Sequence, residues 1–491
     1  MAATLERWWF PRAWDESALL ASRFYFGDAR AYLTYAVALV DGETFDNGVP
    51  FHPPGWPLVL SLVYRALDSS SNSPLDPLTI KHVAAILSGA SVGLTAALAF
   101  TLAGRRAMVI ASFLGTFHFG HMVQAASPNS EPLYGLLVTS VLLCGVWCLR
   151  TQSHVGFCLG WGLLAGFTTL VRAEFALCVA LLVMAGIVLG GRPARWSIAC
   201  FLMGAVLALV PTTIVNWKNL DEFNRTRAGR MPGLLPRFAP VTSYGAFNFA
   251  NANHSAARGG FNFDLPSLLP PEDDANPIGR EQTDLTEAGL LDLSRPVVYR
   301  AYVDGYQMGL AWIAGHPAQA VTLLHSKLSI TMSMFDYGYL LDNIPVAVRG
   351  MRRPVDQIDP GTSWLTFVHF SLALFGAGLA WRAGWSILLL APVVTMLASS
   401  SLFFGYVRLG VAYLPVVWIL QALAIGRLLQ RIPASEAVQR RGLPAAAALG
   451  VLLLLYEAAA SGGQRVLMLD GVVDESGRIV EDQPLMIDRV R

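Results

Sequence analysis

Two acidic residues that begin apolar stretches could act on a hydroxyl group. Asp28 begins DARAYLTYAVALV, in which Tyr32 and Tyr35 follow on the same helix face, and Glu131 begins EPLYGLLV. A carboxylate within hydrogen-bond reach can take the proton of an attacking hydroxyl, or can hydrogen-bond and orient it. The two acids are therefore candidate catalytic residues.

Cationic residues near the ends of apolar stretches could bind a phosphate. Negative charge that develops on a departing phosphate is stabilised strongly by positioned cations. The candidates are His52, Arg172 with its neighbour Glu174, Lys218, Lys327 and Arg408. His52 directly precedes the rigid pair Pro53–Pro54. Together with the two acids, this set could release a lipid-linked phosphate from a sugar while a hydroxyl attacks.

Each residue also has an interpretation without chemistry. Arg408 and Lys218 could be long side chains that anchor helix ends at the membrane interface. The pair Arg172–Glu174 could close a tight turn, and His52 could be an ordinary loop residue. Asp28 could be an acid favoured by the dipole at a helix start. Their shared position at one membrane face favours the chemical interpretation, because ionisable groups at membrane depth are costly.

The composition indicates that lipid is the solvent of much of the chain. Of its 491 residues, 54% are hydrophobic and 14% are charged, whereas a soluble domain carries about 25% charged residues. The net charge of +1 excludes polybasic nucleic-acid binding. The five cysteines lie in apolar segments without a CxxC motif, so we interpret them as core residues.

The apolar runs predict an all-α polytopic membrane protein with about ten spanning helices, since a span needs about 20 apolar residues. The predicted spans are 78–103, 106–126, 131–150, 155–171, 174–190, 196–215, 364–381, 385–404, 407–426 and 443–460. Alternate connections are rich in arginine, for example at Arg105–Arg106, Arg150 and Arg427–Arg441. These connections are expected in the cytoplasm, which places all the candidate site residues on the extracytoplasmic side.

Five regions follow from this topology. Residues 1–77 form a first extracytoplasmic loop region with Asp28, and residues 78–215 form the N-terminal membrane helices. Residues 216–363 are too long for a passive connector, so we expect a folded extracytoplasmic subdomain with surface helices around 299–335. Residues 364–460 form the C-terminal membrane helices, and the tail 461–491 alternates in a way that predicts a small hairpin.

Six stretches, in order over about residues 24–425, resemble one enzyme family. They are GDARAYLTYA…FHPPGWPLVLSLVYRAL, GRRAMVIASFLGTFHFGHMVQAASPNSEPLYGLL, LLAGFTTLVRAEFALCVAL, VPTTIVNWKNLDEFNRTRAGR…APVTSYGAFNFANANHSAARGG, WIAGHPAQAVTLLHSKL and YVRLGVAYLPVV. The chain resembles the bacterial GT-C fold glycosyltransferases of the membrane, and is similar to the protein O-mannosyltransferase-like and aminoarabinose-transferase-like enzymes. Those enzymes use a polyprenyl-phosphate sugar donor on the external membrane face.

The resemblance implies a role for each matching residue. Asp28 takes the position of the family's catalytic acid. Glu131 takes that of a second acid, which assists the acceptor or shares a divalent metal ion with Asp28. His52 stands where the family usually has a lysine that contacts the donor phosphate, and Arg172–Glu174 matches its Arg-Pro-Glu turn. The stretch from Asn248 to Asn253 matches a segment near the sugar.

The resulting expectation is an inverting transferase in a bacterial inner membrane. Its donor is a polyprenyl-phosphate sugar, its acceptor is a lipid, glycan or protein, and its other partners are membrane lipids. The family has a membrane helix before the catalytic acid, and residues 1–27 contain no run of that length, so we expect either that the start codon is placed too far downstream or that this chain lacks the helix. The alternatives are a polytopic transporter and a non-catalytic envelope assembly protein.

Overall fold

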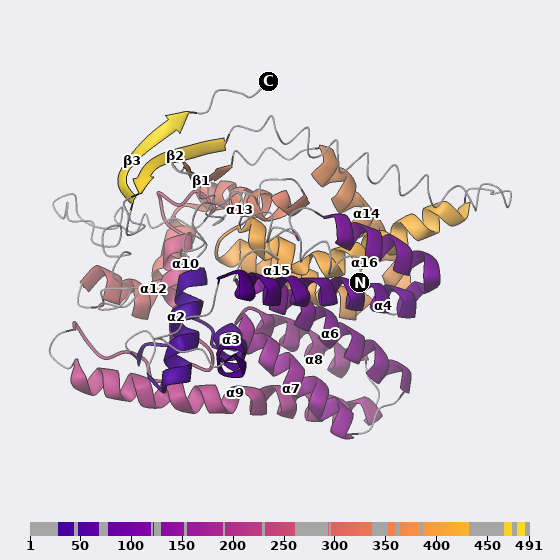
Figure 1. Cartoon of the computed structure of the whole chain (residues 1–491), viewed down its shortest axis with the longest axis horizontal. Coiled ribbons are helices and arrows are strands. Elements are labelled where there is room, and N and C mark those ends of the chain that lie inside the picture. The colour runs from indigo at the N-terminus through magenta and orange to yellow at the C-terminus, as the bar shows by residue number, and fades with distance from the viewer. Residues whose placement is uncertain are drawn as a thin grey trace.

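The computed structural model describes most of the chain. The described residues are 28–43, 48–67, 77–118, 121, 129–151, 155–189, 192–227, 231–260, 293, 296–335, 352–358, 364–382, 386–431, 466–473 and 479–486. Within them, helices dominate (Figure 1), and four are long and apolar enough to cross a membrane. The predicted fold class, a helical polytopic membrane protein, is confirmed.

Helix α16 (Val407–Arg431) forms the centre of the helical bundle. It packs against α4 (Pro77–Phe117), α6 (Glu131–Thr151), α14 (Trp364–Arg382) and α15 (Ser386–Leu402). Its side chains are almost all buried between Val407 and Ala424, including Tyr413 and Trp418. Gly376 of α14 permits one close crossing, because a Cβ there would lie 1.8 Å from the carbonyl oxygen of Leu420. Small residues at helix crossings are typical of packing inside membranes.

Helix α4 reverses direction at Gly104, which has a φ of +79°. The two arms lie side by side: Ser88 is hydrogen-bonded to His121 at 3.1 Å, and Gly115 lies against Val92. Glycine adopts this left-handed conformation without the penalty that a Cβ brings. The two predicted spans 78–103 and 106–126 are therefore one helical hairpin, in which α4 ends at Phe117.

Helices α7 (Val155–Val171) and α9 (Arg192–Thr226) pack closely, and α8 (Phe175–Leu189) lies beside them. A Cβ on Gly162 would lie 1.9 Å from the Phe201 carbonyl oxygen, and one on Gly204 would lie 2.2 Å from that of Leu159. The remaining side of α9 exposes apolar side chains, for example Trp196 and Val206. Such a surface is stable in lipid and unfavourable in water.

Most of the predicted spans coincide with described helices. The shorter apolar helices α7, α8, α14 and α15 match four of them, while the predicted span 443–460 lies outside the described residues. One boundary was wrong: α9 continues eleven residues past the predicted end at 215, to Thr226. Asn216 and Asn224 of this extension hold the segment 231–241, through bonds to the backbone of Ala239, Val241 and Leu235.

A second core lies beyond the bundle and belongs mainly to the region 216–363. It joins the end of α9 to α10 (Gly245–Ala252) and α12 (Pro296–Gly315) through Leu220, Phe247 and Tyr302. Helix α13 (Pro317–Met332) and the short η4 (Ser333–Phe335) lead from α12 back to the bundle. The expected helices around 299–335 are thus present. Helices α2 (Asp28–Asp41) and α3 (Gly55–Ala66) pack against each other at the bundle's edge.

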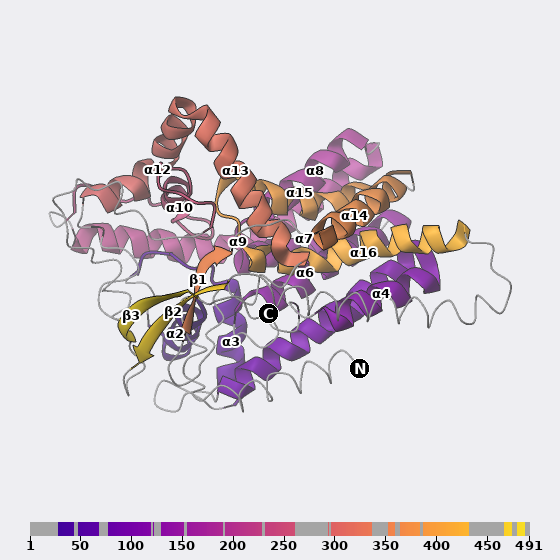
Figure 2. The same cartoon turned by 90° about the horizontal axis from the view of Figure 1, so that it is seen from above.

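Three strands form one small antiparallel sheet in the order β1-β2-β3. Strands β2 (Val466–Val473) and β3 (Ile479–Met486) form the hairpin predicted for the tail, and β2 also pairs with β1 (Arg352–Ile358). In two perpendicular views, the sheet lies at the same end of the molecule as α12 and the last turns of α9 (Figures 1 and 2). The pairing of β1 with β2 therefore places the described part of the tail beside the region 216–363.

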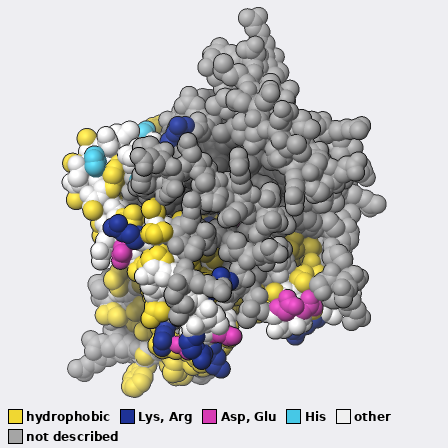
Figure 3. All heavy atoms as spheres, turned by 90° about the vertical axis from the view of Figure 1, so that its left-hand side faces the viewer, with side chains coloured by type: hydrophobic (Ala, Val, Ile, Leu, Met, Phe, Trp, Pro, Cys, Tyr) yellow, Lys and Arg dark blue, Asp and Glu magenta, His cyan; other side chains and the backbone are white. Residues whose placement is uncertain are grey.

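The end of the molecule that carries α12 and the sheet also has charged side chains. In a view of this end, Lys, Arg, Asp and Glu gather near its lower edge, where α9 ends in Figure 1 (Figure 3). Asp221 of α9 forms ion pairs of 3.1 Å with both Arg225 and Arg237. Charged pairs of this kind suit contact with water and indicate that the last turns of α9 project out of the lipid.

Candidate active site

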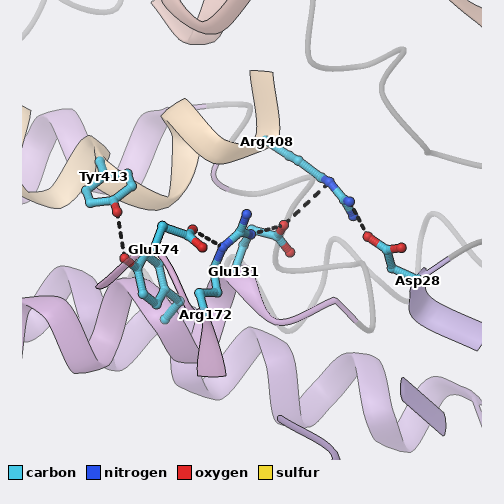
Figure 4. A network of polar contacts seen from close by, with 7 residues as sticks. Asp28, Glu131, Arg172, Glu174, Arg408 and Tyr413 are labelled. Carbon is cyan, nitrogen blue, oxygen red and sulfur yellow. Dashed lines mark hydrogen bonds and ion pairs between the residues drawn. The ribbon is translucent and has the colours of Figure 1, made fainter. Parts of the chain in front are cut away.

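Five charged residues form one continuous network at the edge of the helical bundle (Figure 4). Arg408 pairs with Asp28, and its Nε lies 3.6 Å from Oε1 of Glu131. Arg172 donates through Nη1 to the same Glu131 oxygen at 2.7 Å, and through Nε to Glu174 Oε1 at 2.5 Å. The order Asp28–Arg408–Glu131–Arg172–Glu174 alternates in sign, so each carboxylate has a cationic neighbour.

Helix starts and one tight turn position the network. Asp28 and Glu131 are the first residues of α2 and α6, where the helix dipole favours negative charge. Arg408 lies in the first turn of α16, where that dipole disfavours a cation. Arg172 and Glu174 lie in the turn between α7 and α8. The carboxylates of Asp28 and Glu131 offset the unfavourable interaction between Arg408 and the dipole of α16.

Glu131 is the buried centre of the network. Its side chain is only 2% exposed, and Oε1 receives both guanidinium contacts. Oε2 is buried and has no hydrogen-bond partner among the described residues. Buried polar atoms in proteins are nearly always paired, so an exception calls for an explanation. Oε2 of Glu131 therefore keeps an unused acceptor position at the centre of the network.

Asp28 is the accessible end of the network, with 37% of its side chain exposed. Burial on its own would raise the pKa of Asp28, but the charge of Arg408, followed by those of His52 and Arg172, outweighs it and lowers the pKa. Nε2 of His52 lies 4.0 Å from Asp28 Oδ1, and the His52 side chain is buried. Asp28 is therefore an ionised carboxylate at the partly exposed end of the network.

Aromatic side chains surround the charges. The hydroxyls of Tyr134 and Tyr413 are 2.6 Å apart, and the Arg172 guanidinium lies 5.6 Å from the centre of the Tyr134 ring. Arg408 lies 5.2 Å from the centre of the Tyr406 ring. Burial, and then the nearby charge of Asp28, raise the pKa of Tyr244, whose ring stacks on Phe51 at 4.7 Å. Sequence reasoning passed over Tyr134 and Tyr244, although both lie inside the stretches that carry the family resemblance.

Four candidate residues lie outside this network. Lys327 Nζ donates to Asn253 Oδ1 at 2.8 Å, and both side chains are buried. Lys218 is exposed on α9, and Asn248 is half-buried on α10. No described contact joins Lys218 or Asn248 to the charged network. The structure thus brings together Asp28, His52, Glu131, Arg172, Glu174 and Arg408 from the ten candidates.

The residues do not fit the divalent metal ion that Asp28 and Glu131 were expected to share. Arg408 contacts both carboxylates, and so takes the place of a cation between them. Within the described part of the chain, no three His, Cys, Asp or Glu side chains gather as metal ligands. The chemistry derived below therefore uses the guanidiniums as its positive charges.

Comparison with known proteins gives a likeness of shape alone. No protein-family model matches the sequence, and no curated protein matches it. The Archaeoglobus fulgidus oligosaccharyltransferase, solved with Zn and sulfate, is 15% identical with a TM-score of 0.42, over 88% of this chain and 48% of its own. The same organism's AglB, solved with an inhibitory peptide and a dolichol-phosphate, is 13% identical with a TM-score of 0.41, over 89% and 50%.

A third structure is similar at a lower score. ArnT from Cupriavidus metallidurans, bound to undecaprenyl phosphate, is 14% identical with a TM-score of 0.33, over 81% of this chain and 73% of its own. The chain spans about half the length of the two oligosaccharyltransferase structures. Likeness of this degree gives no information on the reaction, so the chemistry is drawn from the chain's own side chains.

Proposed function

We propose that this chain is an inverting glycosyltransferase of the GT-C fold. It moves a sugar from a polyprenyl-phosphate donor to an acceptor hydroxyl on the extracytoplasmic face of a bacterial inner membrane. The observation that carries the proposal is the alternating network at the bundle's edge, which has an accessible carboxylate at one end and an unpartnered carboxylate oxygen at its centre. The six sequence stretches that resemble this family contain every member of the network.

The network supplies one group for each step of such a transfer. The bond between the anomeric carbon and the phosphate oxygen breaks, and its electron pair goes to the phosphate. The acceptor oxygen forms a new bond to that carbon from the opposite side, which inverts its configuration. The hydroxyl proton goes to the Asp28 carboxylate, which acts as the general base. Glu131 Oε2 accepts a hydrogen bond from the acceptor or the sugar and orients it.

Arg408 is the cation that meets the donor phosphate. Each arginine contacts two acids, but Arg172 lies between the buried Glu131 and Glu174, whereas Arg408 borders Asp28, the accessible end of the network. The charge on the phosphate rises as it departs, which draws Arg408 toward it and weakens its pair with Asp28. The pKa of Asp28 then rises, because its largest stabilising charge has moved. The base thus becomes stronger at the moment when the hydroxyl loses its proton.

The proposal is tested by the purified chain in detergent with a panel of polyprenyl-phosphate sugars. Supplying each sugar with candidate lipid, glycan and protein acceptors should release polyprenyl phosphate for at least one pair, and the product linkage should be inverted. Asp28→Asn should abolish most of this release. A product with retained configuration, or equal release by Asp28→Asn, would overturn the proposed mechanism.

A further inference from the structure

Lys327 is a buried cation with neutral partners only. Its side chain is 1% exposed, and the described residues place no carboxylate within ion-pair distance of it. Nζ donates to Asn253 Oδ1 at 2.8 Å and to the Ser401 carbonyl oxygen at 3.4 Å. Burial lowers the pKa of Lys327 to about 7. A buried ammonium without a counter-charge is costly, so its place in the fold needs a reason.

The contacts of Lys327 stabilise the last turn of α15. Ser401 and Leu402 end this helix, and the last carbonyls of a helix have no partner within it. Lys327 donates to the Ser401 carbonyl, while Nδ2 of Asn253 donates to the Leu402 carbonyl at 3.0 Å. The C-terminal end of a helix dipole is negative and attracts a cation. Lys327 and Asn253 therefore cap α15 from outside.

The capped helix end leads directly to Arg408. Residues 403–406 join α15 to α16, and α13 packs against this turn. A Cβ on Gly405 would lie 2.1 Å from the Lys327 carbonyl oxygen, and the Gly405 amide donates to the Gly259 carbonyl at 2.8 Å. Thr331, one turn after Lys327, bonds to Ser400 at 2.9 Å. The turn before Arg408 is thus held on both sides by the large loop region.

We infer that Lys327 is a positioning residue that fixes the turn between α15 and α16 and so sets the reach of Arg408 toward Asp28 and Glu131. The position of Arg408 is argued from contacts alone; only the reaction in which Arg408 takes part rests on the proposed function. It replaces the expected contact between Lys327 and the donor phosphate, because Asn253 and Ser401 already engage the buried Nζ. The large loop is in this way part of the reaction centre, although it contributes no member of the charged network.

A double-mutant cycle on the unfolding midpoint in detergent tests the inference without any substrate. Asp28→Asn removes the partner of Arg408 and should lower the midpoint of the wild-type protein. In a Lys327→Met background, Asp28→Asn should lower the unfolding midpoint by less than about half of the decrease that it causes in the wild-type protein. The reason is that the loss of Lys327 has already displaced Arg408. The matched control is Arg300→Met, at an exposed cation of α12, which should leave the effect of Asp28→Asn unchanged.

A full Asp28→Asn effect in the Lys327→Met background would overturn the inference and leave Lys327 as a helix cap alone. Should Lys327→Met fail to fold, Asn253→Ala removes the other half of the cap and enters the same cycle with the same expected coupling. Both outcomes are read from midpoints, so neither depends on the identity of the donor.

Binding of a C55 polyprenyl phosphate provides a readout that a purely structural role would not change. Lys327→Met should weaken binding of this probe by about tenfold, comparable to the loss of one charged hydrogen bond, and Arg300→Met should not. Unchanged binding by a folded Lys327→Met protein would contradict the inference. If wild-type protein fails to bind the probe, the donor class under Proposed function is wrong, while the cycle still decides the role of Lys327.

Discussion

Arg172 and Arg408 meet at a single oxygen atom, Oε1 of Glu131, at 2.7 Å and 3.6 Å. Glu131 therefore holds together two cations that would otherwise repel each other. The same atom links the turn between α7 and α8 to the start of α16, although these segments are far apart in the sequence. The network is for this reason a structural element of the bundle as well as a candidate reaction centre.

Replacing Glu131 with Gln should destabilise the protein as well as slow it. The two guanidiniums would lose the negative charge between them, and breaking a buried ion pair costs about 3–5 kcal/mol. We expect a clear drop in the unfolding midpoint in detergent. Glu222→Gln, at an exposed acid of α9, should leave the midpoint unchanged. Equal midpoints for wild type and Glu131→Gln would show that the pairing contributes nothing.

Replacing Asp28 with Asn should lower turnover by orders of magnitude, whereas its effect on the unfolding midpoint is limited to the lost ion pair with Arg408. The amide keeps the size and hydrogen bonding of the side chain and is acceptable near a helix start, but it cannot take a proton. Removing a positioned general base typically lowers the rate by about 10²–10⁴-fold. Asp41→Asn, at the exposed far end of the same helix, serves as the control. Wild-type turnover by Asp28→Asn would leave the helix dipole as the explanation of this acid.

The acid limb of the pH dependence of turnover should shift to higher pH when Arg408 is replaced. Arg408 is the largest charge that lowers the pKa of Asp28, and burial acts in the opposite direction. Arg408→Gln should therefore raise the pKa of Asp28 and shift the acid limb to higher pH. The pair also stabilises the fold above the ordinary pKa of Asp, about 3.9, and this contribution is lost as the pH falls through the lower folded pKa. A limb that stays in place in Arg408→Gln would exclude Asp28 as the titrating base.

Accessibility to an impermeant thiol reagent in intact cells should report the orientation of the bundle. In a variant without its five native cysteines, Glu43→Cys should react, because it follows α2 on the expected extracytoplasmic side. Gln430→Cys, exposed near the other end of α16, should be protected. Both positions should react after the membrane is permeabilised. The reverse pattern would place the network in the cytoplasm and exclude a donor on the outer face.

The helices could be predicted from the sequence more fully than the contacts between them. The spans around α6 to α8 could be predicted because a helix that crosses lipid needs a continuous apolar run. The hairpin β2–β3 could be predicted from the alternating sequence pattern of the tail. The end of α9 was missed because no glycine or proline interrupts its helical sequence between 212 and 226. The partner of that hairpin, β1, was also missed, because pairing across more than 100 residues leaves no local pattern.

The members of the charged network could be found one at a time, but not their order. Asp28 and Arg408 are 380 positions apart, so only the tertiary fold shows that they pair. Lys327 is the clearest difference between expectation and structure. Its charge and its predicted location suggested a phosphate contact, whereas its burial against Asn253 follows from how α10, α13 and α15 pack. Charge can be read from a sequence, but the direction in which a long side chain points cannot.

The reversal of α4 at Gly104 bears on how the protein is made. The two arms are joined by one non-helical residue, Gly104, and the exposed Arg105 and Arg106 follow it directly at the start of the second arm. Contacts such as Ser88 with His121 close the hairpin, so we expect the two arms to enter the membrane as one unit. We therefore expect a bulky residue at position 104 to reduce the amount of chain that inserts during synthesis, in addition to any effect on the folded protein.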